Sequence, residues 1–210
     1  MERKHNELIA KEGWIFFFPL VVAAILALIF LDSLVWGAVL GVLAFYVALF
    51  FRNPYRQIPE EAGTIVSPAD GKVVAVRQMD DGRHQVSIFL NIFNVHINRS
   101  PIAGTVEEVN YTKGRFLSAD KAEASTENER NKLVIRNEEM VVEVTQVAGL
   151  IARRIVCWTQ KDQSLSRGQR FGLIRFGSRT DLVLPATCQI QVRVGQKVSG
   201  GKDIIAKHKP

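Results

Sequence analysis

The sequence has few of the residues from which metal centres and disulfide frameworks are built. Its two cysteines, Cys157 and Cys188, lie far apart and belong to no CxxC or Cys-His pattern. Structural zinc sites and disulfide scaffolds need more ligands or more cysteine pairs than this. We therefore expect no metal site and two buried thiols, as is typical of a protein in a reducing compartment.

Motifs for nucleotides, nucleic acids and common hydrolases are missing as well. The sequence contains no P-loop, no GxGxxG between a strand and a helix, and no GxSxG nucleophile elbow. Its net charge is +6, but it lacks the interleaved aromatic residues of a nucleic-acid-binding surface. These absences argue against a nucleotide-dependent enzyme and against a nucleic-acid partner.

Charged residues are almost absent from residues 14–51. Only Asp32 separates two uncharged runs, Trp14–Leu31 and Ser33–Phe51. As a helix, each run is roughly 27–29 Å long, close to the hydrocarbon thickness of about 30 Å. We predict a membrane-anchoring helical hairpin within residues 1–52, which either spans the bilayer or enters it from one side. The apolar stretch is too long for a signal peptide, and no small-residue cleavage site follows it.

Basic residues flank this hairpin on both sides. Arg3, Lys4 and Lys11 precede it, and Arg52 and Arg56 follow it. By the positive-inside rule, both flanks lie on the cytoplasmic side of the cell membrane. We therefore expect the rest of the chain on the cytoplasmic side as well.

Residues 53–210 are rich in short strand-like segments. Pro54 and Pro59 indicate an extended linker, and Asp80-Asp81-Gly82 indicates a turn. The expected strands are Lys72–Met79, Gln85–Asn91, Gly104–Tyr111, Asn131–Arg136, Met140–Val147 and Ile155–Trp158. The C-terminal segment Gln189–Lys207 resembles the end of a lipoyl-type barrel sandwich. Because no long amphipathic helix is present, we predict a mostly β domain of the lipoyl-like, barrel-sandwich kind.

The pair Gly177-Ser178 stands out in the segment FGLIRFGSRTDLVLP, residues 171–185. It lies between Leu173–Phe176 and Asp181–Leu184, which both have the composition of strands. An isolated Gly-Ser pair is usually only a hairpin corner. The local sequence therefore predicts a turn or a kink at this point.

Two other segments supply an acid and an imidazole. SPADG contains Asp70, and FNVHINRSP contains His96. A histidine among apolar residues is more often structural than catalytic. With Ser178, however, these side chains provide the nucleophile, the base and the orienting carboxylate of hydroxyl-based catalysis. The spacing of the three segments does not establish that they meet.

On these residues alone, two classes of protein remain open. A membrane-anchored serine hydrolase would use Ser178, His96 and Asp70 on an external ester, although the nucleophile elbow is missing. A non-catalytic, membrane-tethered β module would explain the anchor and the C-terminal pattern. It would leave SPADG and His96 unexplained.

The segments FGSR, SPADG and NVHINRSP together resemble the phosphatidylserine decarboxylase proenzyme family in its short bacterial and archaeal form. The resemblance covers nearly the whole chain from about Asn53 onwards. It implies decarboxylation of phosphatidylserine to phosphatidylethanolamine in phospholipid biosynthesis. An archaetidylserine-type substrate with ether-linked tails remains an alternative, because the chemistry concerns only the head group.

The resemblance also implies that the chain cuts itself between Gly177 and Ser178. The products are a β chain, residues 1–177, and an α chain, residues 178–210, which form a heterodimer that is able to dimerise further. Ser178 becomes a pyruvoyl group, a covalent cofactor that serves as an electron sink in place of pyridoxal phosphate.

The same resemblance assigns roles to the site residues. His96, with Asp70 behind it, deprotonates Ser178, whose hydroxyl attacks the carbonyl of Gly177. Glycine suits this position because it has no Cβ to block the approach and tolerates a strained backbone.

Charge and polarity distinguish two further parts of the chain. Residues after Phe51 carry 24 of the 27 basic and 17 of the 21 acidic side chains, and a basic surface beside a bilayer attracts anionic head groups. The polar stretch Lys113–Asn131 is expected to form a solvated loop with at most a helical turn. Its NERN run, from Asn128, resembles a feature near the family's active site, but no role follows from the sequence.

Overall fold

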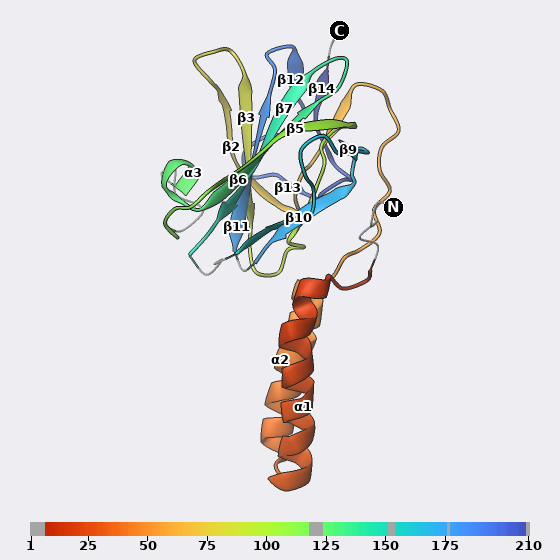
Figure 1. The fold of residues 1–210 in the computed structure, drawn as a ribbon, viewed down its shortest axis with the longest axis vertical. Helices are drawn as coiled ribbons and strands as arrows, with labels where there is room; N and C mark the ends of the chain where they lie inside the picture. The colour runs from red at the N-terminus through yellow and green to blue at the C-terminus, as the bar shows by residue number, and fades with distance from the viewer. Residues whose placement is uncertain (1–6, 118–123, 151–153, 176, 209–210) are drawn as a thin grey trace. The chain divides into compact units, whose positions relative to one another are not determined.

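We describe the protein from a computed structural model, which covers residues 7–117, 124–150, 154–175 and 177–208. The chain divides into two compact units, Met1–Tyr55 and Arg56–Pro210 (Figure 1). Each unit is described by itself.

The first unit is the helical hairpin that the uncharged runs predict. A 3-10 turn, η1 (Lys11–Gly13), leads into α1 (Trp14–Phe30), and α2 (Leu34–Phe50) follows after a short turn. Asp32 has a left-handed φ of 44° in this turn. Ser33 then caps α2 by accepting a hydrogen bond from the Trp36 N–H at 3.4 Å.

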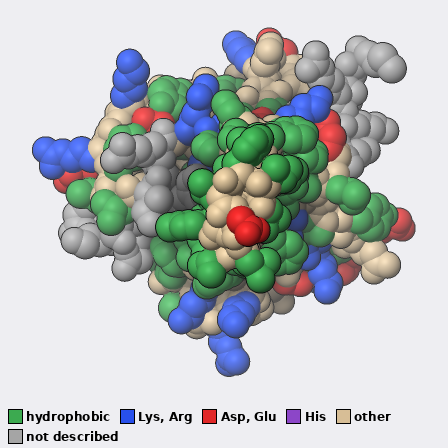
Figure 2. All heavy atoms as spheres, turned by 90° about the horizontal axis from the view of Figure 1, so that it is seen from below, with side chains coloured by type: hydrophobic (Ala, Val, Ile, Leu, Met, Phe, Trp, Pro, Cys, Tyr) green, Lys and Arg blue, Asp and Glu red, His purple; other side chains and the backbone are tan. Residues whose placement is uncertain are grey.

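Small residues form the contact between α1 and α2. Ala27 and Ala44 are buried, and a Cβ at Gly37 would lie 2.4 Å from a methyl carbon of Leu28. Close packing through small residues is the usual way in which helices associate in lipid. The outer surface of the hairpin is mostly apolar when it is seen end-on (Figure 2). Lys11–Phe30 is long and apolar enough to cross a membrane, which suggests that the protein associates with one.

The second unit is a β domain of three antiparallel sheets (Figure 1). The largest sheet has the strand order β13-β2-β3-β11-β7-β6-β5-β9. In chain order these strands are β2 (Gly71–Gln78), β3 (His84–Leu90), β5 (Gly104–Thr112), β6 (Arg130–Arg136), β7 (Val141–Ala148), β9 (Ser164–Leu165), β11 (Ser178–Leu184) and β13 (Lys197–Val198).

Two three-stranded sheets complete the domain. One has the order β1-β14-β12, and the other has the order β4-β10-β8. Their strands are β1 (Thr64–Val66), β4 (Ile97–Arg99), β8 (Ile155–Cys157), β10 (Arg170–Ile174), β12 (Cys188–Ile190) and β14 (Ile204–His208). The one short helix, α3 (Ala124–Glu127), precedes β6. Among the described residues the domain is therefore mostly β, as predicted.

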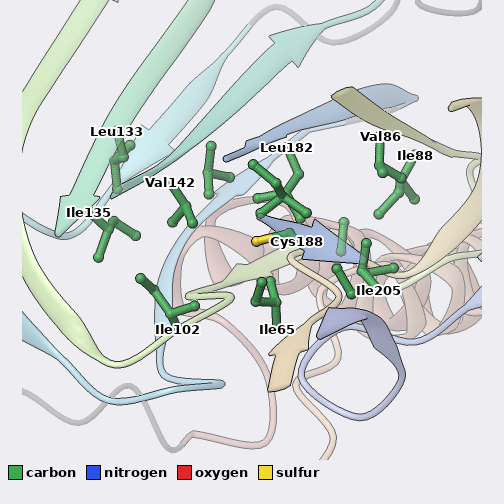
Figure 3. Packing of buried hydrophobic residues seen from close by; sticks show 14 of the residues in the cluster. Ile65, Val86, Ile88, Ile102, Leu133, Ile135, Val142, Leu182, Cys188 and Ile205 are labelled. Atoms are coloured by element: carbon green, nitrogen blue, oxygen red, sulfur yellow. The ribbon is translucent and has the colours of Figure 1, made fainter. Parts of the chain in front are cut away.

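One hydrophobic cluster fills the space between the large sheet and the β1-β14-β12 sheet (Figure 3). Burial alternates along β6 and β7, so every second side chain points inward. Leu133, Val142 and Leu182 enter the cluster from the large sheet, and Ile65 and Ile205 enter it from the smaller sheet. This shared core fixes β11 at the centre of the large sheet.

The predicted strands outside the Gly-Ser segment are confirmed to within one residue at each end. The Asp80-Asp81-Gly82 turn is also confirmed, with Gly82 at a φ of +82°. The turn or kink expected at Gly177-Ser178 is present, since Gly177 has a left-handed φ of +69°, but it is not the corner of a hairpin. β11 begins at Ser178, and β10 and β11 lie in different sheets. The reason is that β11 finds its hydrogen-bonding partners in β3 and β7, which are distant in sequence.

Buried amide side chains link the β4-β10-β8 sheet to the large sheet. Asn98 on β4 donates to Thr180 Oγ1 on β11 at 2.9 Å and accepts from Gln146 Nε2 on β7 at 2.9 Å. Gln146 in turn accepts from Asn131 Nδ2 on β6 at 3.0 Å. All four side chains are at most 1% exposed. Such a network is stabilising only while its members remain paired.

The network predicts that Gln146→Ala lowers the free energy of unfolding by about 2–4 kcal/mol, because it leaves two buried amide groups without their partner. Urea denaturation of the full chain in detergent, followed by circular dichroism, measures the change. Gln78→Ala is the matched control, because Gln78 is exposed at the end of β2. Equal small changes in the two variants would show that the network does not stabilise the fold.

Candidate active site

Gly177 is the residue at which the chain passes from one sheet to another. β10 ends at Ile174, whose N–H donates to the His96 carbonyl at 3.2 Å, and the Arg175 N–H donates to the Arg154 carbonyl at 3.2 Å. Gly177 then takes a φ of +69° before β11 begins. A Cβ at Gly177 would meet no atom within 4 Å. The left-handed backbone at this position favours glycine.

Ser178 is the first residue of β11 and is fully buried. It pairs with Leu90 at the end of β3 and with Ala148 at the end of β7. Its Oγ makes no hydrogen bond with any part of the chain that the structure describes. Leaving a buried hydroxyl unpaired costs about 1–3 kcal/mol. A group kept in this state needs an explanation, and nucleophilic use of the hydroxyl is one.

His96 lies just before β4, 2% exposed, beside the Gly177 peptide unit. Its Nε2 lies 3.3 Å from the Gly177 nitrogen and accepts that N–H. Its Nδ1 lies 2.9 Å from the main-chain oxygen of Asn94. A carbonyl accepts only, so the proton belongs on Nδ1 and the lone pair on Nε2. This is the tautomer of a base directed at the Gly177-Ser178 junction.

Asp70 is held by partners from two other segments. Its Oδ2 accepts from Arg56 Nη2 at 2.7 Å, and its Oδ1 accepts from the Gly200 N–H at 2.7 Å. Arg56, which the sequence analysis counts as a flank of the hairpin, thus binds within the β domain. The main-chain carbonyl of Asn94 contacts the His96 Nδ1 and takes the place that an orienting carboxylate would have next to the ring.

The SPADG segment is joined to β4 by main-chain contacts. The Arg99 N–H donates to the Pro68 carbonyl at 2.9 Å, so SPADG lies beside the strand that follows His96. The pKa of Arg99 is lowered to about 10, chiefly by burial and also by the nearby charges of Arg170 and Arg56, while the charge of Asp70 opposes the change. Asp70 is thus the acid within a buried cluster of guanidinium groups.

The two faces of β11 differ in chemistry. Ser178 and Thr180 share one face, and Thr180 belongs to the buried amide network. Arg179 and Asp181 lie on the other face, where they form a two-contact ion pair at 2.9 and 3.1 Å with little exposure. A shift of β11 by one residue would move the charges of Arg179 and Asp181 to the opposite face of the sheet. The buried ion pair therefore resists such a shift in register.

Asn128 connects the polar stretch 113–131 to the strand beside Ser178. It is fully buried, and its Nδ2 donates to the carbonyls of Leu117 and Ala148 at 2.8 and 2.7 Å. The helical turn expected in this stretch is confirmed as α3, but the expectation of a solvated loop is wrong at Asn128 and Asn131. Residues 118–123 lie outside the described part of the chain.

The burial of the amide residues around the junction was not predicted from the sequence. Asn98, Asn128, Asn131 and Gln146 are all buried within or beside the site. The available signal was the appearance of Asn and Gln at inward positions of strands, where apolar residues are usual. Two of these residues belong to the NERN run.

The described residues contain no group of three or more His, Cys, Asp or Glu side chains able to hold a metal. Both cysteines are free. Burial raises the pKa of the Cys157 thiol, although its hydrogen bond to the Thr159 carbonyl opposes the change. Burial also raises the pKa of Cys188. Neither thiol is therefore suited to act as a nucleophile at neutral pH.

Comparison with known proteins identifies the family. The sequence model described as phosphatidylserine decarboxylase matches residues 43–206. A phosphatidylserine decarboxylase proenzyme of Ralstonia nicotianae is 46% identical over 213 residues and is covered to 96%, as is this chain. A proenzyme of the same name from Symbiobacterium thermophilum is 47% identical, with 99% of each chain covered. One from Syntrophus aciditrophicus is 45% identical over 209 residues. The chain therefore belongs to the phosphatidylserine decarboxylase family of enzymes.

Proposed function

We propose that this protein decarboxylates phosphatidylserine to phosphatidylethanolamine after cutting itself between Gly177 and Ser178. One observation carries the proposal: a buried, unpaired hydroxyl follows a left-handed glycine whose N–H touches the acceptor nitrogen of a buried histidine. The relatives' printed name, which includes both the substrate and the word proenzyme, supports it.

The first step is an acyl shift within the chain. Ser178 Oγ attacks the carbonyl carbon of Gly177, and His96 Nε2 accepts the hydroxyl proton. The Gly177–Ser178 amide bond breaks, its nitrogen takes a proton, and an ester joins Gly177 to Ser178 Oγ. Loss of the Ser178 α-proton then expels the Gly177 carboxylate and leaves dehydroalanine at position 178. Addition of water and release of ammonia complete the conversion to a pyruvoyl group.

The surroundings of residue 178 fit such a group. The position is fully buried between Leu90 and Ala148, so bulk solvent is kept away from it. A pyruvoyl group at this position would supply a ketone able to bind the amine of the lipid serine and to accept the electrons released when CO2 leaves. His96 Nε2 is the site's proton carrier and is able to return a proton to the substrate carbon.

Asn94 and Asp70 support His96 in different ways. The Asn94 carbonyl fixes the ring and its tautomer. Asp70 is proposed to act by fixing the SPADG segment, whose Pro68 carbonyl accepts from the Arg99 N–H of the strand that follows His96. Asp70 also ties the SPADG segment to Gly200 of the future α chain.

The α chain, residues 178–210, would remain bound after cleavage. It comprises β11 to β14, and β11 is hydrogen-bonded along its length to β3 on one side and to β7 on the other. Leu182 and Ile205 of this fragment are buried in the shared core. We therefore propose a stable α–β heterodimer, anchored by the apolar hairpin at the cytoplasmic face of the cell membrane. Further dimerisation remains a proposal from the family resemblance.

Intact-mass analysis tests self-cleavage. The wild-type protein is expected to give fragments of 177 and 33 residues, the smaller one lighter by about 17 Da because ammonia leaves after elimination. Ser178→Ala is expected to remain whole, and Ser164→Ala, an exposed serine in β9, is the control that still cleaves. An uncut wild-type protein in membranes would contradict the proposal and favour an external ester as the substrate of Ser178.

The role of His96 predicts that His96→Ala slows cleavage by about 10²–10⁴-fold, the usual contribution of a positioned base. A time course of fragment formation during cell-free synthesis with vesicles measures the rate. His84→Ala is the control, since His84 begins β3 at the far end from Ser178. If both variants cleave at the wild-type rate, His96 is not the base.

The left-handed backbone at Gly177 predicts a separate effect. An L-residue in this conformation costs about 1–2 kcal/mol, so Gly177→Ala is expected to slow cleavage about tenfold. Gly195 is a matched control, because it also has a positive φ, of +91°, and open space around its Cβ position. Gly195→Ala is expected to lose similar stability in urea and to cleave normally. Equal cleavage in the two variants would show that the Gly177 conformation is not required.

A further inference from the structure

Exposed apolar side chains gather at one edge of the large sheet. β3 ends at Leu90 and β7 ends at Ala148, the two residues that pair with Ser178. Shortly after these strand ends come Phe93 and Leu150, each 65% exposed. The apolar residues therefore flank the Ser178 end of β11 from both sides.

This concentration is unusual for the β domain. From Arg56 onwards, the described residues include five strongly exposed large hydrophobic side chains, and three of them follow directly on β3 or β7 at this edge: Ile92, Phe93 and Leu150. Scattered exposed apolar residues need no explanation, but a cluster beside a functional site indicates an interaction surface.

Basic side chains lie at the same edge. Arg154 is exposed, and its carbonyl accepts from the N–H of Arg175, the last described residue before Gly177. Lys113 is exposed and directly follows β5. The last residue of β5, Thr112, pairs with Arg130 of β6, and Arg130 pairs with Val147 of β7, the residue before Ala148. Arg115 also lies here, paired with Glu127 at 3.2 Å, and Glu129 is a further acidic residue in the described part of this stretch.

We propose that this edge is a docking surface for an anionic phospholipid bilayer. Phe93 and Leu150, with Ile92, enter the boundary between head groups and acyl chains, while Arg154 and Lys113 bind lipid phosphates. An anionic bilayer matches both the apolar and the basic side chains of this surface, because its hydrocarbon region lies beneath a layer of negatively charged head groups. The inference rests on the proposed lipid substrate and deepens it. It adds that residue 178 is presented to the membrane surface by the β domain itself, in addition to the anchoring by the hairpin.

The docking edge also explains how a buried residue reaches a lipid. Ser178 begins its strand, so it lies at the end of β11 next to the segments that carry Phe93 and Leu150. A serine head group at the bilayer surface then has a short path to residue 178 while its acyl chains stay in lipid.

A fluorescent label tests the contact directly and does not depend on catalysis. In the Ser178→Ala chain, reconstituted in vesicles containing phosphatidylglycerol, Leu150→Cys carries an environment-sensitive maleimide dye. The two native thiols react slowly because burial raises their pKa. Ala186→Cys is the matched control, an exposed position at the opposite end of β11. We expect lipids that carry a quencher to quench the dye at position 150 several-fold more strongly than at position 186. Equal quenching at the two positions would overturn the docking surface.

Kinetics of the processed enzyme separate docking from chemistry. The double variant Phe93→Asp with Leu150→Asp is expected to decarboxylate vesicle phosphatidylserine about tenfold more slowly. It is expected to retain self-cleavage and its activity on monomeric short-chain phosphatidylserine. Ala186→Asp is expected to change neither rate. Equal losses on both substrates would overturn docking and assign these residues to the lipid-binding pocket. A wild-type protein inactive on both substrates would instead refute the proposed function.

Discussion

The antiparallel pairing of β11 between β3 and β7 is the constraint on which the site depends. It places Ser178 at a strand end, buried between Leu90 and Ala148. The preceding strand, β10, belongs to another sheet, so the chain has to cross between sheets at Gly177. The left-handed glycine and the contact with His96 both follow from this crossing. If β11 paired with β10 as a hairpin, the serine would lie at an exposed corner and the histidine would have no reason to approach it.

The site places a buried hydroxyl that lacks a hydrogen bond to any described residue next to buried amide side chains that are hydrogen-bonded. The Ser178 hydroxyl is buried with no hydrogen-bond partner among the described residues, whereas the amide groups of Asn98 and Gln146 nearby are hydrogen-bonded. Folded proteins are only marginally stable, so an unpaired polar group persists where neighbouring contacts hold it in place. The buried ion pair of Arg179 and Asp181 on the other face of β11 is one such contact. These contacts hold in place the end of β11 that carries the hydroxyl.

Two kinds of surface connect this fold to lipid chemistry. The hairpin is apolar on its outside and packs through small residues such as Ala27 and Gly37, as helices do in a bilayer. The β domain carries apolar and basic residues around the strand end that holds Ser178. A membrane anchor raises the local concentration of the lipid, but it does not orient a reactive group. A docking edge beside residue 178 would supply that orientation.

The sequence alone determined the features that depend on local composition. The absence of charge from residues 14–51 defined the hairpin, alternation and turn residues defined most strands, and three motifs named Asp70, His96 and Ser178. Tertiary structure decided the rest, because strand pairing joins residues that are distant in sequence and leaves no local signal. It placed Ser178 at the start of a strand and gave the Asn94 carbonyl the position next to the His96 ring. It also buried Asn128 and Asn131, whose polar side chains locally predict a solvated loop, because their hydrogen-bonding partners come from other segments.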